Sequence, residues 1–142
     1  MRAKLSGLVG VGVLLAALPV LAHHSFSAEY DVNRPVTLKG ILTKMEWVNP
    51  HGWIHVDVKG PEGQVVSWSV ETGSPNALLR RGLRKTDFPA GVEVTVQGYR
   101  AKDGSNTANG RSVTTADGRN FFTGSSGGDV PQDNAEKGAA KK

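Results

Sequence analysis

Three segments of this chain alternate apolar and polar residues with a period of two. They read WIHVDVK (53–59), VVSWSVE (65–71) and VEVTVQGY (92–99). Because successive side chains of a β-strand point to opposite faces of the sheet, this alternation predicts strands with one buried face. We expect their inward-facing residues to be Ile54, Val56, Val58, Val66, Trp68, Val70, Val92, Val94 and Val96.

A fourth segment, 36–47, also alternates but changes parity along its length. Its apolar residues form two sets of opposite parity, Val36 and Leu38 in the first and Ile41, Met45 and Trp47 in the second. One extra residue in a strand changes its parity, and glycine often marks such a bulge. We therefore predict one long strand with a bulge at Gly40.

Turn and capping residues separate the predicted strands. Pro61–Gln64 and Ala116–Arg119 contain residues typical of hairpin turns. The stretch GSPNALLRRG predicts a short helix, because Ser74 is a good N-cap, Pro75 suits the first helical position and Gly82 follows the last turn.

The resulting order is three strands, one helix and two or three further strands. With a long, bulged first strand, this order fits an all-β fold, a small OB-like barrel of five to six strands arranged β-β-β-α-β-β. An open sheet with the helix on one face is the alternative, because alternation does not show whether a sheet closes.

The N-terminus has the pattern of a signal peptide. Arg2 and Lys4 precede an apolar run that ends in small residues at Ala22. The run is shorter than the roughly 20 apolar residues of a membrane-spanning helix. No cysteine follows it for lipid attachment. We predict cleavage after Ala22, a periplasmic or secreted protein, and no membrane insertion after cleavage.

Composition divides the chain further. After the signal peptide (1–22) we predict an N-terminal segment (23–34), the barrel domain (35–123) and a tail (124–142). The tail has no aromatic residue and one β-branched residue, Val130. Because it buries too little apolar surface to offset the entropy of ordering, we predict that it is disordered. Without cysteine, the barrel has no disulfide and depends on its hydrophobic core.

Charge and motif content disfavour two function classes. Loss of Arg2 and Lys4 lowers the 17 basic residues to 15, against 13 acidic residues, so the mature net charge is only +2. We therefore expect no nucleic-acid partner. We predict no catalytic residues either. The serines lack a nucleophile motif. The carboxylates of Glu29, Glu46 and Glu71 lack the spacing of a hydrolase pair, and we expect them to be solvated strand or cap residues.

Cleavage after Ala22 makes His23 and His24 the first two residues of the mature chain. The free α-amine and the imidazole of His23 form a chelate for one metal ion, and a third nitrogen from another histidine completes a histidine brace. The amine, the first backbone amide and the imidazole of His24 offer a second route. Such nitrogen sets suit Cu(II). The alternative is that the pair is only a polar start, followed by Phe26 and Tyr30 as hydrophobic anchors.

Two histidines remain as the third ligand. We favour His51, because a loop residue that follows Asn49–Pro50 can turn its ring toward an incoming terminus. His55 is held by the pleat of its strand. With Trp53, the one tryptophan that does not share parity with core residues, His55 forms a possible ligand face.

Several stretches resemble a family of small exported bacterial proteins known mainly as a domain of unknown function. They are AHHSFSAEYD, VTLKGILTKMEWVNPHGWI, GSPNALLRRG and AKDGSNTANGRSV, and the similarity spans residues 22–122. The mature N-terminus HHSF and the core motif EWVNPHGWI carry the resemblance to this family. The resemblance implies export and a barrel-like β domain, and it brings no reaction.

We therefore expect an exported, non-enzymatic metal-binding barrel that uses His23, His24 and His51 for Cu(II), in metal carriage or sequestration. The alternative is a metal-free module whose face around Trp53 and His51 binds an exported protein or a small ligand. Redox catalysis at the same copper would require an open substrate face, which sequence does not show.

Overall fold

The computed structural model describes residues 25–124 of the 142-residue chain. The predicted signal peptide, both histidines of the predicted mature terminus (His23 and His24) and the predicted tail beyond Gly124 lie outside the described residues. The elements in chain order are α1 (Phe26–Glu29), β1 (Tyr30–Glu46), β2 (Trp53–Lys59), β3 (Val65–Glu71), α2 (Pro75–Arg80), the 3₁₀ helix η1 (Lys85–Asp87), β4 (Glu93–Ala101), β5 (Thr107–Thr115) and β6 (Asn120–Phe122).

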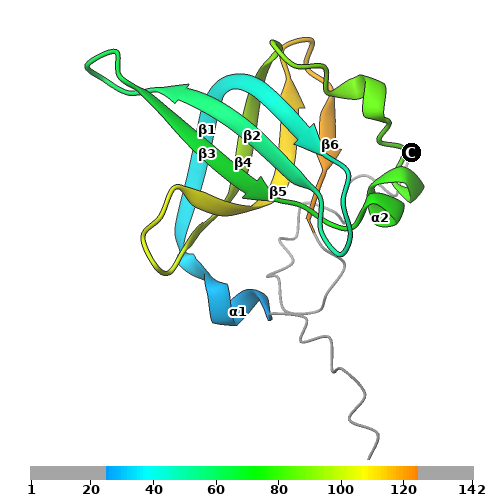
Figure 1. Ribbon diagram of the computed structural model, residues 1–142, viewed down its shortest axis with the longest axis horizontal. Coiled ribbons are helices and arrows are strands. Elements are labelled where there is room, and N and C mark those ends of the chain that lie inside the picture. The colour runs from blue at the N-terminus through cyan, green and yellow to red at the C-terminus, as the bar shows by residue number, and fades with distance from the viewer. Residues whose placement is uncertain (1–24, 125–142) are drawn as a thin grey trace, which may run out of the picture.

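The strands form one sheet that curls into a ring (Figure 1). Their order is β3-β2-β1-β4-β5-β6, and β3 also pairs with β5. This closing pair is parallel and joins Ser69–Glu71 to Thr107–Asn109. The barrel-like all-β fold predicted from the alternation is confirmed, and the β3–β5 pairing contradicts the open-sheet alternative.

The long first strand, β1, pairs with a different strand along each half of its length. Residues 35–41 of β1 pair with β4, and residues 40–46 pair with β2. Gly40 is paired regularly on both sides. The pairing with β2 shifts register between Leu42 and Lys44, and the pairing with β4 shifts between Tyr30 and Pro35. The predicted bulge at Gly40 is therefore wrong. The irregularity falls at Thr43 instead.

This later position changes which side chain faces the core. Leu42 continues the inward parity of Leu38 and is fully buried, whereas Ile41 is 42% exposed, against our prediction. Beyond Thr43 the parity switches, and Met45 packs against the core as predicted. Glycine occupies position 40 for a different reason, because a Cβ there would lie 2.2 Å from the carbonyl oxygen of Asp57.

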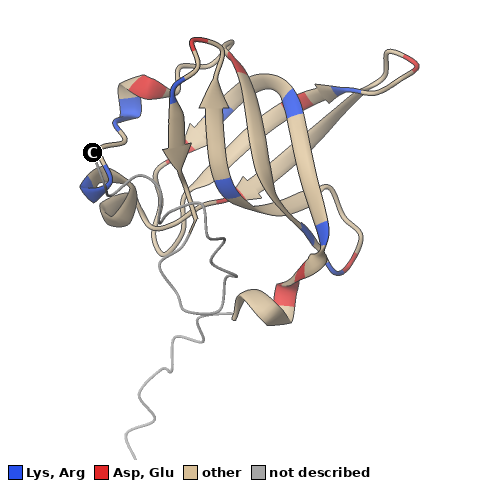
Figure 2. Ribbon diagram, turned by 180° about the vertical axis from the view of Figure 1, so that it is seen from behind, with Lys and Arg blue, Asp and Glu red and all other residues tan. Residues whose placement is uncertain are grey.

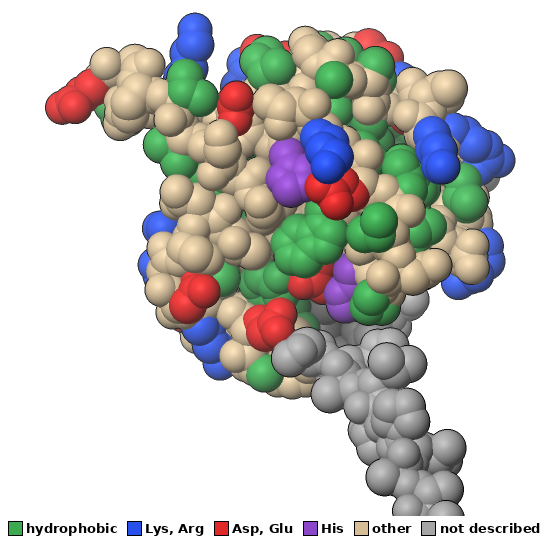
Figure 3. Space-filling model, in the orientation of Figure 1, with side chains coloured by type: hydrophobic (Ala, Val, Ile, Leu, Met, Phe, Trp, Pro, Cys, Tyr) green, Lys and Arg blue, Asp and Glu red, His purple; other side chains and the backbone are tan. Residues whose placement is uncertain are grey.

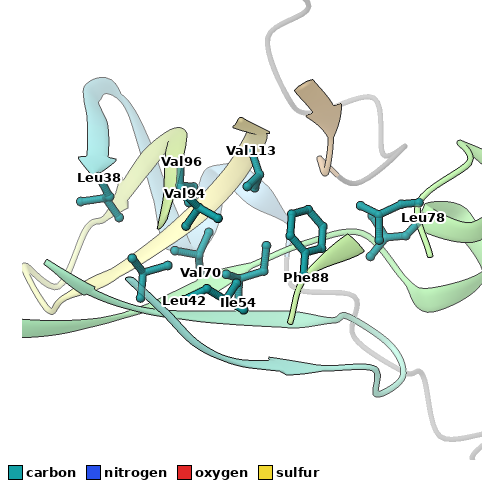
Figure 4. Close-up of a cluster of buried hydrophobic side chains, with 11 residues drawn as sticks. Leu38, Leu42, Ile54, Val70, Leu78, Phe88, Val94, Val96 and Val113 are labelled. Carbon is teal, nitrogen blue, oxygen red and sulfur yellow. The ribbon is translucent and has the colours of Figure 1, made fainter. Parts of the chain in front are cut away.

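Side chains from all five strands of the ring meet in one core (Figure 4). Leu78 from α2 and Phe88, which follows η1, extend the core at one end. Eight of the nine predicted inward residues are buried or pack against the core, and the ninth, Val66, is half-buried.

The predicted turns and helix are confirmed. Ser74 caps α2, since its Oγ accepts a hydrogen bond of 3.3 Å from the amide of Ala77. The hairpin between β2 and β3 closes through the amide of Gly60, which donates to the Gln64 carbonyl at 2.8 Å. A second turn joins β5 to β6, as predicted.

The short helix α1 is docked against one end of the barrel (Figure 1). Phe26 and Tyr30 are buried, with ring centroids 5.7 Å apart, and Tyr99 packs edge-on against Phe26. The loop after β4 also holds the helix, because Lys102 Nζ donates to the Ser27 carbonyl at 2.6 Å. The predicted role of Phe26 and Tyr30 as hydrophobic anchors is thus confirmed.

Charged residues are spread over the strands and loops in the view of Figure 2. Several of them pair with a neighbour of opposite sign, as Lys39 does with Glu93 at 3.3 Å. Within residues 25–124, no helix has the length and apolar character needed to cross a membrane.

Candidate functional site

A buried carboxylate joins two elements that are distant in sequence. Glu71, the last residue of β3, is only 6% exposed. Its Oε2 accepts a hydrogen bond of 2.5 Å from the hydroxyl of Tyr30, and its Oε1 pairs with Nδ1 of His51. One carboxylate therefore connects the start of β1 with the loop that precedes β2.

The electrostatics of this cluster keep the tyrosine protonated. Burial and the hydrogen bond to Glu71 raise the pKa of Tyr30 well above its ordinary value. The phenol therefore remains a hydrogen-bond donor to Glu71 at physiological pH. A carboxylate that is ionised can only accept, and Nδ1 is the ring nitrogen of His51 that faces Oε1.

His55, on β2, has a different environment, between side chains of the neighbouring strands β1 and β3. Its Nε2 lies 3.1 Å from Oε1 of Glu46, and its Nδ1 lies 3.2 Å from Oγ of Ser69. Lys44 donates to the same oxygen of Glu46 at 2.7 Å and, with His55, holds the pKa of that carboxyl below its usual range. Both ring nitrogens of His55 are engaged, in a cross-strand polar network that stabilises the sheet.

His51 differs from His55 in its second ring nitrogen. Its ring is partly exposed, and within residues 25–124 no hydrogen bond reaches Nε2. Figure 3 shows that both described histidines lie on one face of the molecule, with hydrophobic side chains between them. Of these two, only His51 presents a nitrogen without a hydrogen-bond partner in the described part of the chain.

A pocket of about 470 Å³ lies beside the cluster, between α1, the start of β2 and the loop from β4 to β5. Trp53 and Tyr30 form aromatic parts of its wall, and Glu29, Lys102 and Asp103 bring charges to it. Hydrogen bonds from Ser105 and the nearby charge of Arg100 lower the pKa of Asp103. The predicted surface aromatic Trp53 is half-buried in this wall.

His51, Trp53 and His55 were predicted from the sequence as candidate site residues, whereas the contacts of Glu71 with His51 and Tyr30 were not predicted. Glu71 was predicted to be a solvated strand or cap residue, which is wrong, because it is buried and accepts a hydrogen bond from Tyr30. Local sequence carries no signal for this burial, since Tyr30 and Glu71 are 41 residues apart. Among the described residues, no group of three or more histidine, aspartate or glutamate side chains is arranged to hold a metal ion.

Comparison with known proteins identifies a family and no relative of known function. No curated protein and no solved structure gives a significant match to the chain. A family model matches residues 11–111, which include α1, the first four strands of the barrel and the His51–Glu71–Tyr30 cluster. The chain therefore belongs to this family, a family of unknown function (DUF6152).

Proposed function

We propose that the mature chain binds Cu(II) through His23, His24 and His51 and acts in copper carriage or sequestration outside the cytoplasm. Two of these residues come from the terminus created by cleavage after Ala22. There the α-amine and an imidazole nitrogen form one chelate, and His51 completes the nitrogen set that suits Cu(II).

The observation that carries the proposal is the state of the His51 ring. A histidine that binds a metal through one nitrogen usually donates the other N–H to a carboxylate or a carbonyl. Nδ1 of His51 contacts the carboxylate of Glu71, which is the arrangement such a ligand requires, and within the described residues its Nε2 makes no hydrogen bond. His55 lacks this arrangement, since Glu46 and Ser69 occupy both of its nitrogens.

The short tether between the barrel and the terminus also supports the proposal. Tyr30 and His51 both contact the carboxylate of Glu71, so the start of β1 lies close to the proposed third ligand, His51. Only six residues separate Tyr30 from His23, and four of them form α1, which is about 6 Å long at 1.5 Å per residue. The three peptide steps from His23 to Phe26 span at most about 11 Å.

The experiment is a titration of the exported protein with Cu(II) after mass spectrometry has identified its N-terminus as His23. Variants of His23 and His51 to alanine should each weaken binding at least tenfold, about 1.4 kcal/mol. His55→Ala is the matched control and should bind as the unmutated protein does. A chain with one extra residue before His23 should lose the chelate, because its amine is displaced.

Three outcomes would contradict this function. The mature chain would begin elsewhere than at His23, the unmutated protein would take up no copper, or His51→Ala would leave both affinity and the EPR spectrum unchanged. In the last case the terminal histidines bind alone and the brace is wrong.

A metal-free ligand-binding module is the second candidate, and the pocket beside Trp53 favours it. An aromatic face and the carboxylate of Asp103 suit an organic cation. Choline added to metal-free protein should then change tryptophan fluorescence, and Trp53→Leu should remove that response without altering Cu(II) affinity. An unchanged signal at millimolar choline would exclude a quaternary ammonium ligand for this pocket.

A further inference from the structure

Each oxygen of the Glu71 carboxylate has its own partner from a different element. Tyr30 donates to Oε2 from β1, and His51 donates to Oε1 from the loop before β2. The carboxylate is buried, so these two donors replace the water that would otherwise solvate its charge. With Nδ1 carrying the hydrogen, a neutral His51 ring has its lone pair on Nε2.

We propose that Glu71 and Tyr30 are positioning residues that hold His51 in the Nδ1–H tautomer and present Nε2 to a metal ion. The metal part of this inference rests on the proposed function, whereas the tautomer does not. Glu71 acts on the ring directly, and Tyr30 acts through Glu71.

Tyr30 is suited to this role because its ring is itself fixed. It is buried in the cluster with Phe26 and Ala101, and Tyr99 packs against that cluster. The hydroxyl is therefore delivered to Glu71 from a rigid position, and the helix that leads to the N-terminus is anchored by the same ring. Tyr30 thus both anchors α1 on the barrel and donates the hydrogen bond to the carboxylate that contacts His51.

The chain contains an internal comparison for this arrangement. Glu46 and His55 are also a glutamate–histidine pair, but their side chains are about one-third exposed. Lys44 competes for the same oxygen of Glu46. Substitutions at Glu46 and Tyr99 therefore match those at Glu71 and Tyr30 in chemistry while leaving His51 untouched.

The first test is made on the metal-free protein, by ¹H–¹⁵N correlation spectra of the histidine rings at mildly alkaline pH. His51 should be the Nδ1–H tautomer in the unmutated protein. Glu71→Gln and Tyr30→Phe should shift it toward Nε2–H, whereas Glu46→Gln and Tyr99→Phe should not. An Nε2–H tautomer in the unmutated protein, or an unchanged His51 tautomer in Glu71→Gln, would overturn the inference. If Glu71→Gln does not fold, Tyr30→Phe, which keeps the packed ring, decides the point.

The second test measures Cu(II) affinity of the same variants. Loss of a partner behind a ligand typically costs 10- to 100-fold, so Glu71→Gln should lose affinity in that range. Tyr30→Phe should lose up to about tenfold, and both controls should bind normally. If the unmutated protein binds no copper, the proposed function fails while the tautomer measurement still decides the positioning role. If it binds copper and all four variants bind equally, the positioning role fails and the function stands.

Discussion

Val56→Asp should leave the barrel unfolded or barely folded at room temperature. Val56 is fully buried at the centre of β2, where it is paired with Leu42 on one side and Trp68 on the other. An unpaired carboxylate at such a site costs several kcal/mol, whether it stays charged or takes up a proton. Small domains are stable by only about 5 to 15 kcal/mol in total. Circular dichroism during urea and thermal unfolding would measure the loss.

The matched control is Val65→Asp, which makes the same chemical change on the neighbouring strand. Val65 is 57% exposed, so its carboxylate remains in water. We expect a loss below about 1 kcal/mol, the scale of strand preferences. Cooperative unfolding of Val56→Asp near the midpoint of the unmutated protein would show that this face of β2 is not the core face.

Gly40→Ala should also destabilise the barrel strongly, by about 3 kcal/mol, the upper part of the usual range for overpacked sites. The added Cβ would lie 2.2 Å from the carbonyl oxygen of Asp57 and 2.9 Å from a methyl of Val56. The first of these atoms belongs to the backbone of β2, so the two strands would have to separate where their pairing begins. Urea unfolding of the purified variant would measure the change.

Gly60→Ala is the control for this substitution. The three atoms nearest to its added Cβ all belong to the side chain of Gln64, which can rotate away. The cost should stay within about 1 kcal/mol, since at most one exposed hydrogen bond is lost, which the Glu62 amide donates to Oε1 of Gln64. Equal stability of the two glycine variants would contradict this prediction, because it would mean that β1 and β2 can move apart at Gly40 at no cost in stability.

The candidate site should keep its geometry in the folded molecules of the Val56 and Gly40 variants, because it lies away from both substitutions. His51 lies in the loop before β2 and Glu71 is the last residue of β3, away from the crowded contact at Gly40. A variant that weakens the centre of the barrel should therefore reduce the folded fraction without changing the copper affinity of the molecules that remain folded. Stability and binding must be measured separately for each variant.

The sequence by itself determined the elements whose causes are local. Alternation in 53–59, 65–71 and 92–99 identified the core faces, because the period of a strand is set by its own backbone. Ser74, Pro75 and Gly82 marked the helix through capping groups that act within a few residues. His51 was also favoured by a local argument, its place in a loop.

Tertiary structure alone decided the features that depend on contacts between distant residues. The bulge falls at Thr43 and not at Gly40. Position 40 requires glycine because the backbone of Asp57 on the next strand comes too close for a Cβ. Glu71 is buried because Tyr30, 41 residues earlier in the chain, covers it and donates to it. Neither residue lies near the other in the sequence, so the hydrogen-bonded contact of Tyr30, Glu71 and His51 forms only in the folded barrel.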